Sequence, residues 1–156
     1  MQLGLPLIAK DTLKEALGGE LGATDRQDSH RLGAAVFELM RVLVPELLRH
    51  GVSLMAEGNF TMQTRVFDSL PPCRIVQVYV TATPPVLRAR LLNRDDRHPV
   101  HYDQDAADEI AGRADAGEWD PLPLDGPLVR IDTTDGFDVV AAVRKVSDTL
   151  KVSDTG

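Results

Sequence analysis

The sequence has little cysteine, no long apolar run and no excess of positive charge, and each shortage excludes a class of protein. Its one cysteine, Cys73, cannot form an intramolecular disulfide and is typical of the reducing cytoplasm, where we expect the protein to reside. No apolar run approaches the length of a membrane span, and the opening MQLGLPLIAKDTLK lacks the basic segment and cleavage site of a signal peptide. The net charge of −7 argues against broad binding to nucleic acid or anionic lipid.

What is present fits one globular domain, expected over residues 1–150, with a frayed tail at 151–156. Short apolar runs alternate with segments of helical periodicity, which predicts an α/β fold with a mainly parallel sheet and helices on both faces. The expected strands are Leu5–Ile8, Val52–Ala56, Ile75–Val80 and Leu128–Ile131.

The expected helices have recognisable start and stop signals. Gly18-Gly19 predicts the end of the first helix, and Thr83 before two prolines predicts the start of another. Pro45 predicts a kink or a break in the longest helix, and residues 22–30 are expected to form a loop or a short cap. The helices are Thr12–Leu17, Arg31–His50, one that begins after Thr83, Asp105–Ala116 and Gly136–Leu150.

The region from Arg74 to His101 holds the most informative pattern, a buried strand followed by a helix with an arginine stripe. Arg90, Arg94 and Arg97 lie at i, i+4 and i+7, so one continuous helix would place all three on one face. Guanidinium groups that converge beyond the end of a strand bind phosphate chains well. A solvated helix face is the competing interpretation.

Two acidic residues follow the first two predicted strands, Asp11 after the first and Glu57 after the second. Open parallel sheets bind ligands beyond the carboxyl ends of their strands, so we expect both carboxylates to lie in a site. Phosphoryl transfer requires one carboxylate near the attacking hydroxyl, another near Mg²⁺, and cations around the phosphoryl oxygens. The two acids and the arginine stripe match that set.

Each candidate also has a structural interpretation. Asp11 could cap the helix that follows it, which is worth about 1 kcal/mol and is compatible with catalysis. Glu57 follows a strand expected to be buried on both faces, where an unpaired carboxylate is costly, and this favours a functional role. Asp132 lies in the turn-rich DTTDG and is expected to stabilise that turn. His98 and His101 in RHPVH lack the further ligands of a zinc site.

Five segments, in this order, resemble the small P-loop kinase-like ATP-binding proteins, a group often described as AAA-domain ATPases and related to zeta toxins, chloramphenicol phosphotransferase and gluconate kinase. The segments are GLPLIAKDTLKEAL, SHRLGAAVFELM, GVSLMAEGNF, RIVQVYVTATPPVLRARL and RHPVH, and the likeness covers nearly all of residues 3–147. The resemblance implies a three-layer P-loop NTPase-like fold with a parallel sheet between helices. It also implies ATP and Mg²⁺ as cofactors.

The resemblance further implies roles for single residues. Asp11 would be the acid or base that orients the acceptor hydroxyl, and Glu57 would lie near Mg²⁺. The three arginines of the stripe would belong to a lid that closes over the phosphates, where they would serve both catalysis and ATP binding. Asp132 and Thr133 would lie near the adenine.

One motif of that family is absent, because no GxxxxGK[ST] occurs in the 156 residues. Roughly thirty residues, the size of an opening strand–loop–helix unit, are missing relative to the family. In the family that strand is central, between the strands expected here at Val52–Ala56 and Ile75–Val80. Its loss would leave two inner edges unpaired or force them to pair directly. A start codon assigned too far downstream explains this better than a truncated gene or a rearranged sheet, since the remainder keeps the family pattern.

The sequence therefore predicts most of an ATP-dependent P-loop kinase that acts on a small-molecule hydroxyl, with negligible activity and weak ATP binding for residues 1–156 themselves. The alternative is a degenerate, non-catalytic interaction or regulatory module, as a homodimer that covers the exposed sheet edges. A hydrolase that uses Glu57 with His98 or His101 has no supporting spacing. Neither nucleic acid nor a membrane is an expected partner, and nothing in the sequence names the acceptor.

Overall fold

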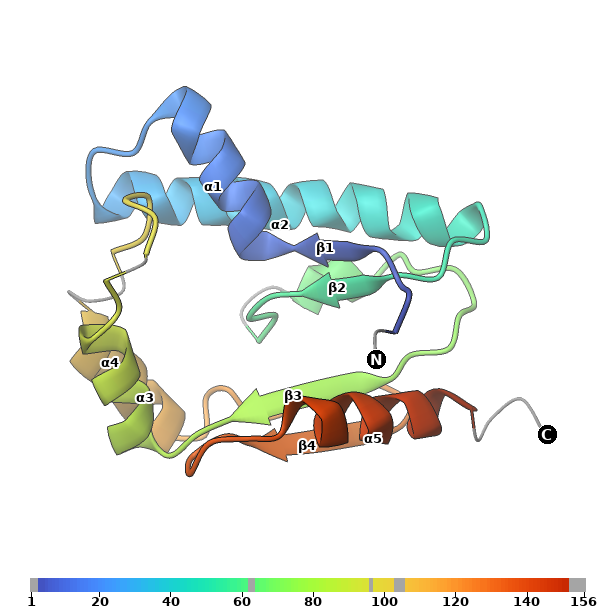
Figure 1. Ribbon diagram of the computed structural model, residues 1–156. Helices are drawn as coiled ribbons and strands as arrows, with labels where there is room; N and C mark the ends of the chain where they lie inside the picture. Colours follow the sequence, from blue (N-terminus) through green and yellow to red (C-terminus); the bar gives the residue numbers. More distant parts are fainter. Residues whose placement is uncertain (1–2, 62–63, 96, 103–105, 152–156) are drawn as a thin grey trace.

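The computed structural model describes residues 3–61, 64–95, 97–102 and 106–151 as a mixed α/β arrangement (Figure 1). The tail expected at 151–156 lies outside these residues except for Lys151, the last residue of the last helix. Within the described residues, no helix has the length and apolar character needed to cross a membrane. In chain order the elements are β1 (Leu7–Ala9), α1 (Lys10–Leu21), α2 (Arg26–Arg49), β2 (Met55–Glu57), the 3₁₀ helix η1 (Thr64–Phe67), β3 (Gln77–Thr81), α3 (Pro84–Leu92), α4 (Ala107–Asp115), β4 (Leu128–Asp132) and α5 (Val139–Lys151).

All the predicted strands are present, and each ends one residue later than the sequence indicated. β1 pairs with β2 and β3 pairs with β4, both in parallel. The α/β class is therefore confirmed, but the described strands form two separate two-stranded sheets rather than one sheet. β2 and β3 are the inner strands, and all the arrows point toward α3 and α4 (Figure 1). Neither inner strand is paired on its inner edge by any described strand.

The first two helices are longer than predicted. α1 passes through Gly18-Gly19 without ending, so the predicted stop is wrong. α2 begins where Asp25 caps it by accepting a hydrogen bond from the backbone N–H of Asp28, and most of the predicted loop at residues 22–30 is helical. α2 also continues through Pro45, where a kink or a break was expected. The buried ring packs in the core, and packing of a long amphipathic helix outweighs the missing hydrogen bond.

The arginine stripe does not lie on one helix. Thr83 occupies the N-cap of α3 as predicted, although its side chain makes no capping hydrogen bond. α3 ends before Asn93, whose side-chain amide donates to the Ala89 carbonyl at 2.8 Å. Arg94 and Arg97 therefore lie beyond the helix, and the expectation of a single arginine face is wrong.

The main hydrophobic cluster lies between α2 and the β1–β2 sheet. Its buried members come from one face of α2 and from η1: Val36, Phe37, Met40, Val44 and Val66. Ile8 of β1 and Ala56 of β2 pack against this cluster from the sheet. This packing fixes the carboxyl ends of β1 and β2 relative to the first half of α2, and a cavity opens at that junction.

Candidate functional site

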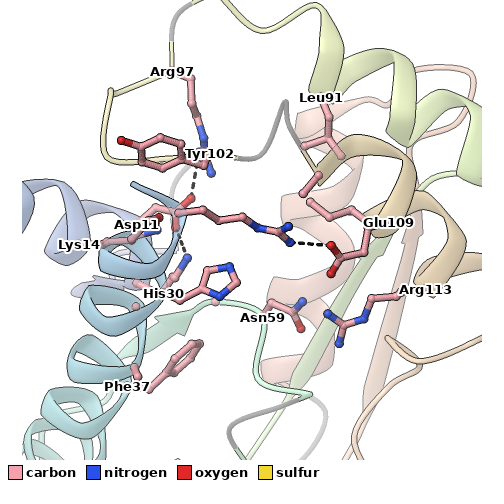
Figure 2. A pocket seen from close by; sticks show the side chains of 18 of the residues that line it. Asp11, Lys14, His30, Phe37, Asn59, Leu91, Arg97, Tyr102, Glu109 and Arg113 are labelled. Carbon is pink, nitrogen blue, oxygen red and sulfur yellow. Dashed lines mark hydrogen bonds and ion pairs between the residues drawn. The ribbon is translucent and has the colours of Figure 1, made fainter. Parts of the chain in front are cut away.

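A cavity of about 550 Å³ opens at the carboxyl ends of β1 and β2 (Figure 2). Its walls come from α1, the first half of α2, the loop after β2, the segment 97–102 and α4. Small-molecule sites have this size, and open parallel sheets bind ligands at this edge. Asp11, Glu57 and Arg97, which the sequence analysis selected, all line it.

Asp11 is the centre of a charge cluster in this cavity. Lys10 Nζ donates to Asp11 Oδ1 at 2.7 Å, and Arg97 Nη1 donates to Oδ2 at 3.0 Å. Desolvation acts to raise the pKa of Asp11, but the hydrogen bond and charge of Lys10, with the charge of Arg97, lower that pKa from 3.8 to about 2. Ala9, not Asp11, occupies the N-cap of α1, so side-chain capping does not explain Asp11. Its carboxylate is ionised throughout the physiological range.

Glu57 ends β2 and is paired in register with Ala9 of β1. The apolar run before Glu57 predicted a strand buried on both faces, but Glu57 is exposed because its short strand is covered on one face only. Partial desolvation in the cavity and repulsion from Asp11 raise the pKa of Glu57, against the charges of Lys10 and Arg97. Two carboxylates therefore meet at the strand ends, one strongly ionised and one that gains a proton more readily.

The segment 97–102 is fastened to α1 by contacts that the sequence did not reveal. A Cβ at Gly18 would lie 2.5 Å from Val100 Cγ2, so the glycine permits this close approach. His101 Nε2 lies 3.0 Å from Glu15 Oε1, and the histidine side chain is 0% exposed. Burial, and the charge of Arg97, lower the pKa of His101, so the neutral ring donates its Nε2–H to Glu15. The sequence pattern that could have indicated this contact is the i, i+4 spacing of Asp11 and Glu15, which places both carboxylates on one face of α1.

The opposite wall of the cavity joins α2 to α4. Arg26 Nη2 lies 2.6 Å from Glu109 Oε2, an ion pair between the first turn of α2 and the first turn of α4. In Figure 2, Glu109 and Arg113 project from the wall that faces Asp11. The Arg113 guanidinium lies 5.7 Å from the centre of the Trp119 ring. Sequence reasoning missed this wall, because none of these residues follows a strand.

The remaining predicted site residues lie outside the cavity. Arg90 Nη1 donates to Thr133 Oγ1 at 2.7 Å, and its second Nη donates to the Thr133 carbonyl. Asp132 accepts from the backbone N–H of Thr134 at 2.8 Å and from its hydroxyl at 2.6 Å, which confirms the predicted turn. Arg94 is exposed beyond α3. The residues that do not line the cavity, and whose roles in ATP binding stay predictions, are Arg90, Arg94, Asp132 and Thr133.

Comparison with known proteins places the chain in a family. No family model matches the sequence, and no curated protein matches it. Among solved structures it is similar to a protein of Chloroflexus aurantiacus J-10-fl described as a "putative kinase", with 33% identity and a TM-score of 0.80 over 96% of this chain and 86% of that chain. The chain belongs to the same family as this protein. Membership of this kinase-like family agrees with the broad function that the sequence predicted.

Kinases transfer phosphate with the help of Mg²⁺, so we asked whether the side chains of this cavity could hold that ion. In the described part of the chain, no group of three or more His, Cys, Asp or Glu side chains could hold a metal by itself. In phosphoryl-transfer sites Mg²⁺ is usually bound by one or two carboxylates together with phosphate oxygens and water. Glu57 supplies one such carboxylate. Desolvation and repulsion from Asp11 raise the pKa of Glu57, and a bound cation would relieve that repulsion. The donor set fits Mg²⁺ bound together with a nucleotide.

Proposed function

We propose that the protein is an ATP-dependent kinase of the P-loop type that phosphorylates a hydroxyl group of a small molecule. The observation that carries this proposal is the meeting of Asp11, Glu57 and Arg97 in one cavity at the carboxyl ends of parallel strands. Phosphoryl transfer is catalysed by positioning and charge stabilisation, and these are the groups that it requires. Membership of a kinase-like family supports the same reaction class.

In this mechanism Asp11 accepts a hydrogen bond from the acceptor hydroxyl and aims its oxygen at the γ-phosphorus. The new O–P bond forms as the bond to the ADP oxygen breaks; ADP keeps the electron pair, and the hydroxyl proton passes to Asp11. A carboxylate with a pKa of about 2 is a weak base, but a loose transition state needs orientation more than early proton removal. Arg97 would neutralise phosphoryl oxygens. Glu57 would hold Mg²⁺, which supplies further charge neutralisation.

The P-loop assignment is supported by the unpaired inner edges of β2 and β3. One parallel strand between them would join the two sheets into one, in the order that P-loop kinases use. The carboxyl end of that strand would bring a phosphate-binding loop beside Asp11 and Glu57. Val78 and Val80, which are 39% and 59% exposed on β3, would be covered by the helix that follows such a loop.

The test compares ATP turnover by residues 1–156 with turnover by a longer polypeptide in which a strand–GxxxxGK[ST]–helix segment is fused before Met1. We expect negligible turnover from the first and about 1–100 s⁻¹ from the second. Asp11→Asn in the longer polypeptide should lower turnover at least about 100-fold. Glu20→Gln, at an exposed position of the same helix outside the cavity, is the control. Kinase-like rates from residues 1–156, or indifference to Asp11→Asn, would contradict the proposal.

A second candidate is a non-catalytic dimeric module. The observation in its favour is the exposure of large apolar side chains on β3 and α5, where Val80 is 59% exposed and Val140 is 52% exposed. A second copy could cover such a face. Light scattering separates the candidates, since a dimer of residues 1–156 that binds no nucleotide supports the module and a monomer counts against it.

A further inference from the structure

We propose that the acceptor carries an anionic group, a carboxylate or a phosphate, and that Arg26 and Arg113 bind this group at the wall formed by α2 and α4. This inference rests on the proposed function, because it names the class of substrate that the same cavity takes. The acceptor hydroxyl would then lie at Asp11, and the anionic group at the opposite wall (Figure 2).

The charge of the cavity differs in sign from that of the protein. Among the residues that the structure describes, five Lys or Arg side chains line the cavity against three Asp or Glu side chains, whereas the whole chain has a net charge of −7. A local excess of cations in an acidic protein attracts anions selectively to that place. The phosphates of the nucleotide account for part of this excess, but they are needed at the strand ends rather than at the far wall.

The cations divide into two groups by position. Lys10 and Arg97 are hydrogen-bonded to Asp11 at the strand ends, where the transferred phosphoryl group would lie. Arg26 and Arg113 lie on the other wall, where Glu109 is the one carboxylate that lines the cavity within the described part of the chain. Arg113 Nε lies 2.7 Å from Oε2 of Glu118, which does not line the cavity, so each of the two guanidinium groups has one carboxylate partner. A guanidinium carries five N–H donors, so one such pair does not exhaust it. The planar donor geometry of both groups suits bidentate binding of a carboxylate or a phosphate.

Glu109 occupies the position on Arg26 that the anionic group of the acceptor would take, and the acceptor can displace it. The Glu109 side chain is 50% exposed and that of Arg26 is 43% exposed, so their ion pair contributes little to stability. An acceptor that offers its own oxygens to Arg26 therefore loses little by displacing this carboxylate. A neutral acceptor has no charged group that could replace the Glu109 carboxylate at Arg26.

Trp119 gives a separate reason to place an acceptor of hydrogen bonds at this wall. It lines the cavity beside Arg113, and its Nε1–H is buried with no hydrogen-bond acceptor among the described residues. A buried N–H without a partner is costly and rare in folded proteins. An oxygen of the anionic group would satisfy this donor.

The experiment measures binding of small probes to the protein by calorimetry and ligand-observed NMR, without nucleotide. The probes are inorganic phosphate, glycerol 3-phosphate and glycerate, with glycerol as the neutral control. We expect at least one anionic probe to bind and glycerol not to bind. Binding of glycerate alone assigns a carboxylate, and binding of the phosphate probes alone assigns a phosphate. Equal binding of glycerol, or no binding of any anion, overturns the proposal.

Two substitutions with opposite expected effects separate ligand binding from a merely structural ion pair. Arg26→Gln should weaken binding of the anionic probe about tenfold, the effect of losing a charged hydrogen bond. Glu109→Gln removes the competing carboxylate and should strengthen binding about threefold. Arg31→Gln, an exposed arginine of α2 outside the cavity, is the control for lost charge. Effects of Arg26→Gln and Glu109→Gln in the same direction overturn the proposal.

Trp119→Phe keeps an aromatic ring beside Arg113 but removes the N–H donor. We expect it to weaken binding of the anionic probe about threefold, with thermal unfolding measured in parallel to establish that the variant is folded. Folded protein with unchanged affinity overturns the role of this donor. Because no nucleotide is present, these outcomes are independent of whether the protein transfers phosphate, which the turnover assay decides.

Discussion

The half of the molecule built from β1, α1, α2 and β2 is packed differently from the half built from β3, α3, β4 and α5. The first, which we call the α2 half, contains the hydrophobic cluster in which Val36 and Met40 are 0% exposed. The second, the β3–β4 half, buries Val129 and Val146 but leaves Val80 59% exposed. Both halves are parallel two-stranded sheets with helices, so the difference lies in what covers them. In the α2 half, the helix α2 buries the apolar side chains of the sheet, whereas part of the β3–β4 half leaves apolar side chains exposed.

The contacts between these halves lie at the functional site. The segment 97–102, which follows α3, contacts α1 of the α2 half: Arg97 binds Asp11, Val100 packs on Gly18, and His101 binds Glu15. The cavity therefore coincides with the junction of a well-packed unit and a less covered one. Parts of low local stability are the usual source of lids and ligand-binding segments. Changes in each half should consequently have unequal effects on stability and on the site.

The largest effect is expected from Met40→Ala in the α2 half. Met40 is fully buried in the main cluster, and its truncation should lower the free energy of unfolding by about 3 kcal/mol through lost burial and a residual cavity. Leu39→Ala, on the adjacent exposed position of α2, should cost about 0.5 kcal/mol or less. Urea denaturation followed by circular dichroism measures both. Equal losses would show that the two faces of α2 are not distinguished by packing.

Gly18→Ala tests the contact that fastens the two halves. A Cβ at Gly18 would lie 2.5 Å from Val100 Cγ2, so the segment 97–102 must move, and we expect a loss of about 1–3 kcal/mol. Gly19→Ala is a matched control on the same helix, because nothing lies within 4 Å of its added Cβ. That variant should gain about 0.5–1 kcal/mol from helix propensity. Thermal unfolding of the two variants measures both changes in stability. If both variants are more stable than the unsubstituted protein, Val100 does not pack against Gly18.

The sequence predicted elements well where local patterns determine them and poorly where contacts distant in sequence do. Every strand was found because an apolar run needs only burial to be recognisable. Gly18-Gly19 was taken for a helix stop, yet Gly18 is required by its contact with Val100, eighty-two positions away. Pro45 was taken for a kink or a break, and the break is wrong, because the packing of α2 keeps the helix continuous. In both cases tertiary packing overrode a local signal.

The same distinction applies to the site. Asp11 and Glu57 were predicted from one topological rule, that parallel strands end at one edge, and the cavity contains both. The arginine stripe failed because α3 ends before Asn93, which sends Arg97 to Asp11 and leaves Arg90 on Thr133. Arg26 and Glu109 are eighty-three positions apart, and no periodicity relates them. The wall formed by α2 and α4 can therefore be identified only from the three-dimensional arrangement of the helices.

A smaller effect is expected from pH at the junction of the halves. Burial lowers the pKa of His101 below its ordinary 6.5, so the unfolded chain binds this proton more readily than the folded one. Stability from this group is complete above pH 6.5 and is lost as the pH falls from 6.5 toward the lowered pKa. His101→Gln, which can still donate to Glu15, should remove this part of the pH dependence. Denaturation between pH 7.5 and 5.5 measures it, and an unchanged slope in His101→Gln would contradict this assignment.

The smallest effect is expected from Val80→Ser in the β3–β4 half, and it sharpens the comparison most. Val80 is 59% exposed in the single chain, so its replacement should change the free energy of unfolding of residues 1–156 by about 0.5 kcal/mol or less. Val129→Ser, on the neighbouring strand where the side chain is 2% exposed, should cost several times more because a hydroxyl is buried. Urea denaturation at two protein concentrations gives both values. A large, concentration-dependent loss for Val80→Ser would mean that a second copy covers this face in solution, and the two halves would then be equally well covered.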